Sequence, residues 1–254
     1  MFSFLKKDKE ILVPPIIDEI ENAVFAHLKP YGFKKHGRTL HRFVSGDISQ
    51  LIHFQSGRPL NGMDGLLCVN TGIRVPECVE RSFHPQAEKK KYYHEYECNI
   101  RSRLGIVSGK KETWYDLRKP TGKIIKSILE EIDQYVLPAF EVLSSREAIL
   151  AHRTQFPLLD TFNRTMLLEE SMIYGHWGDM EKAKEVFESY YRHIVDEYND
   201  KCENGEKMYL KKGQRVIYMG QDITAQQDGY VTLYGASHTH IDYLDNLAIK
   251  LGLR

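Results

Sequence analysis

The residues best suited to bind a ligand are two arginines, Arg101 and Arg103, separated by a single residue. Alternate residues of a β-strand point to the same face of a sheet. In a strand over residues 99–104, Ile100 and Leu104 face a core, so both arginines and Asn99 face the other way. Arginine binds carboxylate and phosphate groups through paired N–H donors. The spacing therefore predicts an anion-binding sheet face.

Other segments add polar side chains to the same predicted face. The strand candidate over residues 51–55 supplies a histidine and a glutamine, and the one over residues 66–72 supplies an asparagine. In residues 39–44, either His41 or Arg42 can join them. The alternative is an exposed face whose arginines pair with nearby acids. The predicted ligand-binding residues are Arg42, His53, Gln55, Asn70, Arg101 and Arg103.

A helix and a series of short strands must position these side chains. Apolar residues recur at helical spacing in residues 16–28, after two prolines that suit a first turn. No helix of crossover length separates the first three strand candidates, so we expect an antiparallel sheet. A second amphipathic helix is predicted over residues 121–143. The predicted strands are Thr39–Val44, Leu51–Gln55, Leu66–Gly72, Asn99–Leu104 and Thr113–Leu117.

The second half of the chain is predicted to be mainly helical. A helical hairpin is expected over residues 158–174 and 180–198, and a final helix ends before Gly252. Between them, residues 215–220 and 229–234 suit a short β-hairpin. The predicted fold class is therefore α+β. Its predicted domains are a helix-plus-antiparallel-sheet domain over residues 1–145 and a mainly helical region over residues 146–254.

Short motifs in the first half resemble a known family. They include Gly32-Phe33-Lys34-Lys35, Val69-Asn70-x-Gly72, Cys98-x-Ile100-Arg101-x-Arg103-Leu104-Gly105 and Trp114-Tyr115, in this order. This pattern is similar to the bacterial domain of unknown function 4304 over residues 16–145. The resemblance implies a helix-plus-sheet domain and implies no reaction. No family suggests itself for residues 146–254.

Composition excludes several classes of protein. Hydrophobic residues make up 42% of the chain and charged residues 28%, which argues against disorder. No apolar run is long enough for a membrane span. The N-terminal residues lack the apolar stretch of a secretory signal, so we expect a cytoplasmic location. Residues 1–125 carry 21 Lys and Arg against 14 Asp and Glu, and the remaining residues carry the reverse. Overall neutrality makes nucleic acid a less favoured partner than protein.

The sequence predicts no cofactor, metal site or catalytic group. The four cysteines form no C-x-x-C pair, which argues against a structural zinc site. The segment His238-x-His240-x-Asp242 resembles part of a metallohydrolase signature, but Tyr243 occupies the position of its last histidine. Neither a G-x-S-x-G elbow nor a G-x-G-x-x-G loop is present.

Two hypotheses for function remain. The first is a non-catalytic protein-binding module, for example an immunity-type protein that neutralises a bacterial toxin. The absence of catalytic motifs and the acidic helical half are consistent with it. The alternative is an enzyme or binder directed at phosphate or nucleic acid through the basic sheet face. Salt-dependent binding that is lost with both arginines would distinguish the second from the first.

Overall fold

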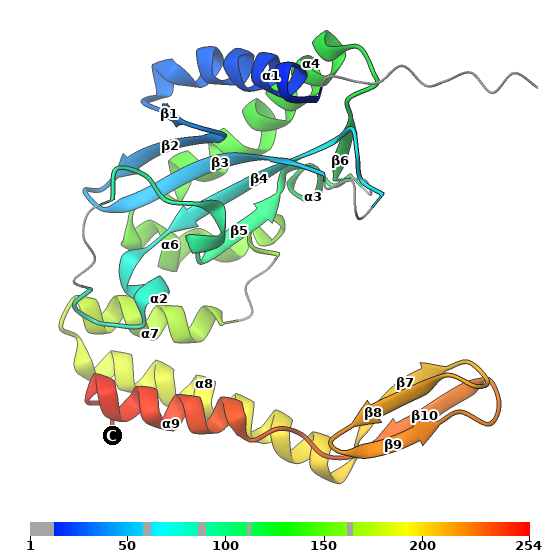
Figure 1. The fold of residues 1–254 in the computed structure, drawn as a ribbon. Coiled ribbons are helices and arrows are strands. Elements are labelled where there is room, and N and C mark those ends of the chain that lie inside the picture. The colour runs from blue at the N-terminus through cyan, green and yellow to red at the C-terminus, as the bar shows by residue number, and fades with distance from the viewer. Residues whose placement is uncertain (1–12, 58–61, 86–89, 111–112, 162–164) are drawn as a thin grey trace, which may run out of the picture. The chain divides into compact units, whose positions relative to one another are not determined.

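The computed structural model describes residues 13–57, 62–85, 90–110, 113–161 and 165–254 (Figure 1). The chain divides into two compact units. The first comprises residues 1–80 and 85–164, and the second comprises residues 81–84 and 165–254. The first unit thus extends past residue 145, the predicted boundary, and the second also includes a short piece of the first half.

An antiparallel sheet forms the centre of the first unit. Its strands lie in the order β1-β2-β3-β4-β5, and β6 also pairs with β4. The five predicted strands are all present, whereas β1 was not predicted. A three-residue loop with positive φ at Ser45 and Gly46 joins β2 to β3 in a hairpin. The bounds are β1 Lys34–His36, β2 Thr39–Val44, β3 Ile48–Ser56, β4 Leu66–Arg74, β5 Ile100–Arg103 and β6 Trp114–Asp116.

Two helices cover one face of this sheet. Figure 1 shows α1 (Val13–Leu28) and α4 (Thr121–Glu131) on the same side of it. Their apolar stripes are buried, as helical spacing predicts. Leu40 of β2 and Phe54 of β3 face the helices and are fully buried. The buried stripes consist of Ile17, Ile20, Val24 and Leu28 in α1, and of Ile124 and Ile128 in α4.

The second predicted helix changes its winding near Pro138. After α4, a π-helical turn runs from Ile132 to Val136, and α5 (Leu137–Val142) follows. Proline lacks an N–H and its ring crowds the carbonyl four residues earlier, which disturbs α-helical bonding. The backbone N–H of Leu137 accordingly donates to the carbonyl of Ile132, five residues earlier. This wider turn directly follows Glu131, which is important for the site described below.

Short helices connect the elements of the first unit. None of the helices in the described part of the chain has the length and hydropathy of a membrane span.

The shortest helices of the first unit are 3₁₀-helices. Those with three residues occupy Lys29–Tyr31, Glu95–Glu97 and Arg153–Gln155, and a longer one occupies Pro157–Asp160. The short α-helices are α2 Pro76–Glu80, α3 Leu104–Val107 and α6 Arg146–His152.

The second unit combines a helical hairpin, four strands and a final helix, α9 (Thr239–Leu251). The hairpin is formed by α7 (Met166–His176) and α8 (Met180–Glu203). The predicted strands are present, but each pairs with a strand that the sequence did not reveal. Strand β8 pairs with β9, and β10 pairs with β7. The bounds are β7 Glu206–Leu210, β8 Arg215–Tyr218, β9 Gln221–Thr224 and β10 Gly229–Leu233.

Candidate functional site

The polar face predicted from strand alternation is present in the first unit. In the register of β3, β4 and β5, His53 lies opposite Asn70, and Asn70 lies opposite Arg103. Arg101 is two residues from Arg103 and shares its face. The Nδ2 group of Asn70 donates to Oε1 of Gln55 at 3.0 Å. Five of the six predicted residues therefore lie on one face, opposite the helices. We call this surface the polar sheet face.

Arg42 does not lie on the polar sheet face, so its predicted placement is wrong. Strand β2 directs it to the helix side, where its Nε donates to Gln50 at 2.8 Å. Its Nη2 lies 2.7 Å from Glu141, and its guanidinium lies 4.9 Å from the centre of the Phe33 ring. The alternative, His41, occupies the polar sheet face and is buried. Polar residues lie on both sides of β2, so alternation alone could not choose between the two.

The segment over residues 92–98 packs against the polar sheet face. The ring of Tyr92 stacks on His36 with 3.6 Å between the ring centres. Tyr93 and Cys98 form a buried apolar cluster with Leu51. Gly72 makes room for this segment, because a Cβ atom there would lie 2.7 Å from Sγ of Cys98. Much of the face is therefore an internal surface.

The arginines of the polar sheet face already have a carboxylate beside them. Nε of Arg101 lies 3.0 Å from Glu95, which the 3₁₀-helix at residues 95–97 presents to the sheet. Burial raises the pKa of Glu95, while Arg101 and Arg103 oppose this shift. Arg103 also donates to Oγ1 of Thr113 at 3.3 Å. Arg101 is thus paired with a nearby acid, as in the alternative to an anion-binding face.

His53, on the same face, has a lowered pKa, which favours its neutral form. Burial lowers the pKa of His53, and the neighbouring His94 and Arg38 lower it further. Its Nδ1 lies 3.0 Å from the hydroxyl of Thr39. Burial likewise lowers the pKa of His41, with help from Lys34 and His36. The face thus contains one buried and one half-buried imidazole, His41 and His53, whose pKa values are both lowered.

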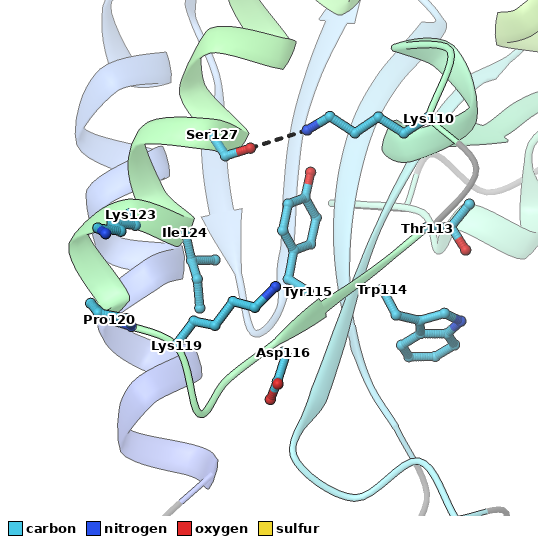
Figure 2. A pocket seen from close by; sticks show the side chains of 10 residues that line it. All are labelled: Lys110, Thr113, Trp114, Tyr115, Asp116, Lys119, Pro120, Lys123, Ile124 and Ser127. Carbon is cyan, nitrogen blue, oxygen red and sulfur yellow. Dashed lines mark hydrogen bonds between the residues drawn. The ribbon is translucent and has the colours of Figure 1, made fainter.

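A pocket of about 400 Å³ lies between β6 and α4. Figure 2 shows Tyr115 pointing from β6 toward α4, with Trp114 on the other side of the strand. Lys119 extends from the loop before α4 toward Tyr115, and Lys110 reaches in from beyond α3. Lys123 belongs to the lining but points away from β6. The lining residues are Lys110, Thr113, Trp114, Tyr115, Asp116, Lys119, Pro120, Lys123, Ile124 and Ser127. We call this pocket the lysine pocket.

A buried carboxylate, Glu131, anchors the polar groups of the lysine pocket. Glu131 is 5% exposed and accepts hydrogen bonds from four side chains. Although burial alone would raise its pKa, these four donors lower the pKa overall. The carboxylate therefore remains ionised and holds the lysine and the tyrosine in place. The donors are Ser108 at 2.8 Å, Lys110 at 2.5 Å, Tyr115 at 2.9 Å and Ser127 at 2.8 Å.

The start of α4 adds a positive helix end to this pocket. Pro120 precedes the helix without a side-chain cap, and the first turn contains no acidic residue. Lys119 and Lys123 flank this end instead. Helix N-termini carry unpaired N–H groups and a partial positive charge, which favour anions and disfavour lysines. Within the described part of the chain, neither lysine has a side-chain hydrogen bond or an acidic partner. The arrangement is suited to receive an anion.

Sequence reasoning missed the lysine pocket, although two signals for it are present. Residues 119–123 read Lys-Pro-Thr-Gly-Lys, so lysines stand where a helix start usually carries acids. Glu131 lies seven residues after Ile124 and three after Ile128, on the apolar stripe of α4. A charge at such a position predicts a buried, paired carboxylate. Among the described residues, no cluster of three or more potential metal ligands is present.

Comparison with known proteins identifies one part of the chain, residues 24–142. No curated protein and no solved structure gives a significant match. A family model described as "Domain of unknown function (DUF4304)" matches residues 24–142. This range contains the helix-plus-sheet motifs, the polar sheet face and the lysine pocket. Residues 24–142 of this chain are a DUF4304 domain.

Proposed function

We propose that the DUF4304 domain is a binding module for a small phosphate-bearing ligand held in the lysine pocket. The observation that carries this proposal is Lys119, which extends into the pocket beside an uncapped helix start. A phosphate group there accepts hydrogen bonds from the ammonium group and from the first N–H groups of α4. The pocket volume lies within the usual range for small-molecule sites.

The walls of the pocket support a ligand that carries more than a phosphate. Ile124, Pro120 and the ring of Tyr115 provide apolar surface next to the lysines. Lys110 is oriented by Glu131 and Ser127, so its ammonium group has lost most of its conformational freedom before a ligand binds. Preorganised groups of this kind improve affinity because less ordering accompanies binding. We therefore expect a phosphate monoester or diphosphate with a compact apolar body.

The ionisation states of the pocket favour binding over acid–base catalysis. The pKa of Glu131 is lowered, so this group remains a carboxylate at neutral pH and is a poor proton acceptor. Burial and the neighbouring Glu131 raise the pKa of Tyr115 well above its usual range, so the phenol keeps its proton. The hydroxyl of Tyr115 donates its hydrogen bond to Glu131, so neither group is placed to transfer a proton to a ligand. We therefore propose that the pocket binds its ligand without catalysing a reaction.

Calorimetric titration with inorganic pyrophosphate tests the proposal. Lys119→Met should weaken binding about tenfold, and Lys119→Arg should retain most of it, because the positive charge remains. Lys126→Met is the matched control, since Lys126 is an exposed lysine on α4 outside the pocket. Equal affinity in the wild type, Lys119→Met and Lys126→Met would exclude the lysine pocket as the phosphate site.

A second candidate function is protein binding by the second unit, as in the immunity-type prediction. The strands β7 and β10 present Tyr209 and Tyr230 opposite each other, 50% and 74% exposed. Ile217 and Met219 near the β8–β9 turn are also exposed. Exposed apolar and aromatic side chains that gather on a surface are often a site of protein binding. Tyrosine is also enriched at the energetic centres of protein interfaces. A toxin is one partner of this kind.

Affinity capture with matched variants separates the second candidate from the first. The tagged protein and its Tyr209→Ser/Tyr230→Ser variant are compared in the same lysate. A stoichiometric protein that binds the wild type and is lost with the double variant supports the protein-binding function. Tyr243→Ser, at an exposed tyrosine of α9, is the control and should retain the partner. Retention by the double variant would argue against this surface.

A further inference from the structure

A second cavity lies near the far end of β4 from the lysine pocket. The lysine pocket adjoins β6, which pairs with the first residues of β4, whereas Arg74 at the end of β4 lines this cavity. The cavity has a volume of about 310 Å³. Apolar side chains form most of its walls, namely Phe43, Pro76, Pro85 and Tyr93. We call it the Arg74 cavity.

Arg74 is a buried cation with unused hydrogen-bond donors. It is 4% exposed, and its Nη2 lies 2.6 Å from Glu80. Its guanidinium carbon lies 4.0 Å from the centre of the Tyr93 ring, which stacks against it. Within the described residues, its Nε and Nη1 atoms have no hydrogen-bond partner. Buried donors are nearly always paired in folded proteins, so such atoms indicate where an acceptor belongs.

The carboxylates around this cavity are already engaged elsewhere. Asp47 lines the cavity, and its two oxygens accept from Arg146 at 2.9 and 3.0 Å. Glu77 is fully buried and also binds Arg146, at 2.6 Å. Lys90, the other cation of the lining, is held by Glu97 at 2.7 Å. Among the described residues that line the cavity, no carboxylate is left to accept from Nε and Nη1 of Arg74.

We propose that the Arg74 cavity binds a small carboxylic acid with a flat apolar body. The carboxylate accepts hydrogen bonds from the guanidinium of Arg74, with the ammonium group of Lys90 nearby. The body packs between Phe43, the two prolines and the ring of Tyr93. A monoanion suits this site better than a phosphate, because Asp47, Glu80 and Glu97 would repel a second negative charge. This ligand differs in chemistry and in place from the one proposed for the lysine pocket.

Titration with benzoate, followed by protein NMR, tests this proposal. Benzoate should bind saturably, while benzyl alcohol, which has the same ring without the charge, should bind at least about tenfold more weakly. Arg74→Met should weaken benzoate binding about tenfold. Lys90→Met should weaken it about threefold, because that ammonium group is more exposed and already paired.

Two features keep the test decisive. Arg74→Met removes a buried ion pair and could therefore destabilise the protein. Phe43→Ala is a second variant, at a half-exposed side chain of the cavity wall whose loss should leave the fold intact. It should weaken benzoate and benzyl alcohol equally, because it removes contact with the ring alone. Equal affinities for benzoate and benzyl alcohol would overturn the proposal. So would benzoate binding that neither Lys90→Met nor Phe43→Ala changes.

Discussion

The polar sheet face and the lysine pocket both collect cations within one DUF4304 domain, but they differ in what those cations already contact. On the polar sheet face, Arg101 lies 3.0 Å from Glu95, and a chain segment packs over the neighbouring strands. In the lysine pocket, Lys119 extends toward Tyr115 from an uncapped helix start. Each region thus has a cation paired with a carboxylate, Arg101 with Glu95 and Lys110 with Glu131. The lysine pocket differs because Lys119 has no acidic partner within the described residues, so a count of basic residues alone does not distinguish the two regions.

The pKa values of the carboxylates in the two regions are shifted in opposite directions. Four donors surround Glu131 and lower its pKa, so its negative charge is favoured in the folded state. Glu95 is left with a raised pKa, because burial outweighs the arginines. A carboxylate with a lowered pKa stabilises the fold above its unfolded pKa, and this contribution is lost as the pH falls through its folded pKa. Glu131 should therefore stabilise the domain near neutral pH far more than Glu95.

The largest expected effect follows from removing this carboxylate. Glu131→Ala leaves Lys110, Tyr115 and two serines without their acceptor, so the free energy of unfolding should fall by about 3 kcal/mol. Urea unfolding measures this, with Trp177→Phe in the background so that Trp114 alone reports on the first unit. Glu130→Ala, at an exposed neighbour, is the control and should remain within about 0.5 kcal/mol of the parent. Similar losses in both variants would contradict the proposed role of Glu131.

A smaller effect tests whether the polar sheet face is closed by the segment over residues 92–98. In Gly72→Ala, the new Cβ would lie 2.7 Å from Sγ of Cys98, so one of them must move. We expect a loss of about 2 kcal/mol, typical of overpacking in a core. Adding Cys98→Ala should recover part of the loss, since the sulfur is the nearest atom. Gly122→Ala has open space around its Cβ and should be neutral or slightly stabilising.

Gly72→Ala without a loss of stability would mean that the segment is loosely held. The polar sheet face would then be open for part of the time, and the comparison with the lysine pocket would weaken. Hydrogen exchange distinguishes these cases, because a loosely held segment exchanges its amides faster than the strands beneath it. The same measurement on Gly72→Ala should show faster exchange in residues 92–98 than in the wild type.

A third prediction compares the two sets of cations directly. Arg101→Met should change the affinity for pyrophosphate by less than about twofold, whereas Lys119→Met should weaken it about tenfold. The reason is that Arg101 already has Glu95 beside it, so a ligand would have to displace that carboxylate. Calorimetry on both variants at the same ionic strength gives the ratio of their dissociation constants for pyrophosphate. If Arg101→Met weakened pyrophosphate binding more than Lys119→Met does, the phosphate site would lie on the polar sheet face instead of in the lysine pocket.

The sequence revealed the sheet better than it revealed the pocket, for a physical reason. The period of two along a strand is a local property, so it placed His53, Gln55, Asn70, Arg101 and Arg103 on one face. It failed for β2, because His41 and Arg42 are both polar and both sides of that strand accept polar groups. The lysine pocket depends instead on β6 pairing with β4 and on the path from β6 to α4. Such long-range pairing leaves little trace in local periodicity.

The smallest expected effect concerns pH and separates the two regions once more. The pKa of His53 is lowered by burial, by His94 and by Arg38, so the unfolded chain takes up a proton at a higher pH than the folded protein does. The free energy of unfolding should therefore decrease as the pH falls from above 6.5, the unfolded pKa, toward the folded pKa. In His53→Gln, this decrease should be smaller by an amount that corresponds to a few degrees in Tm.

Melting curves of the Trp177→Phe background at pH 7.5 and about 5.5, followed through Trp114, measure this difference. His193→Gln, at an exposed histidine of α8, is the control and should keep the pH dependence of the parent. Because Glu131 keeps its charge throughout this range, the lysine pocket should contribute little to the change. An unchanged pH dependence in His53→Gln would exclude His53 as its source, and His41, whose pKa is lowered in the same direction, would be tested next. A smaller decrease in His53→Gln would place this part of the pH dependence on the polar sheet face, which the sequence identified first.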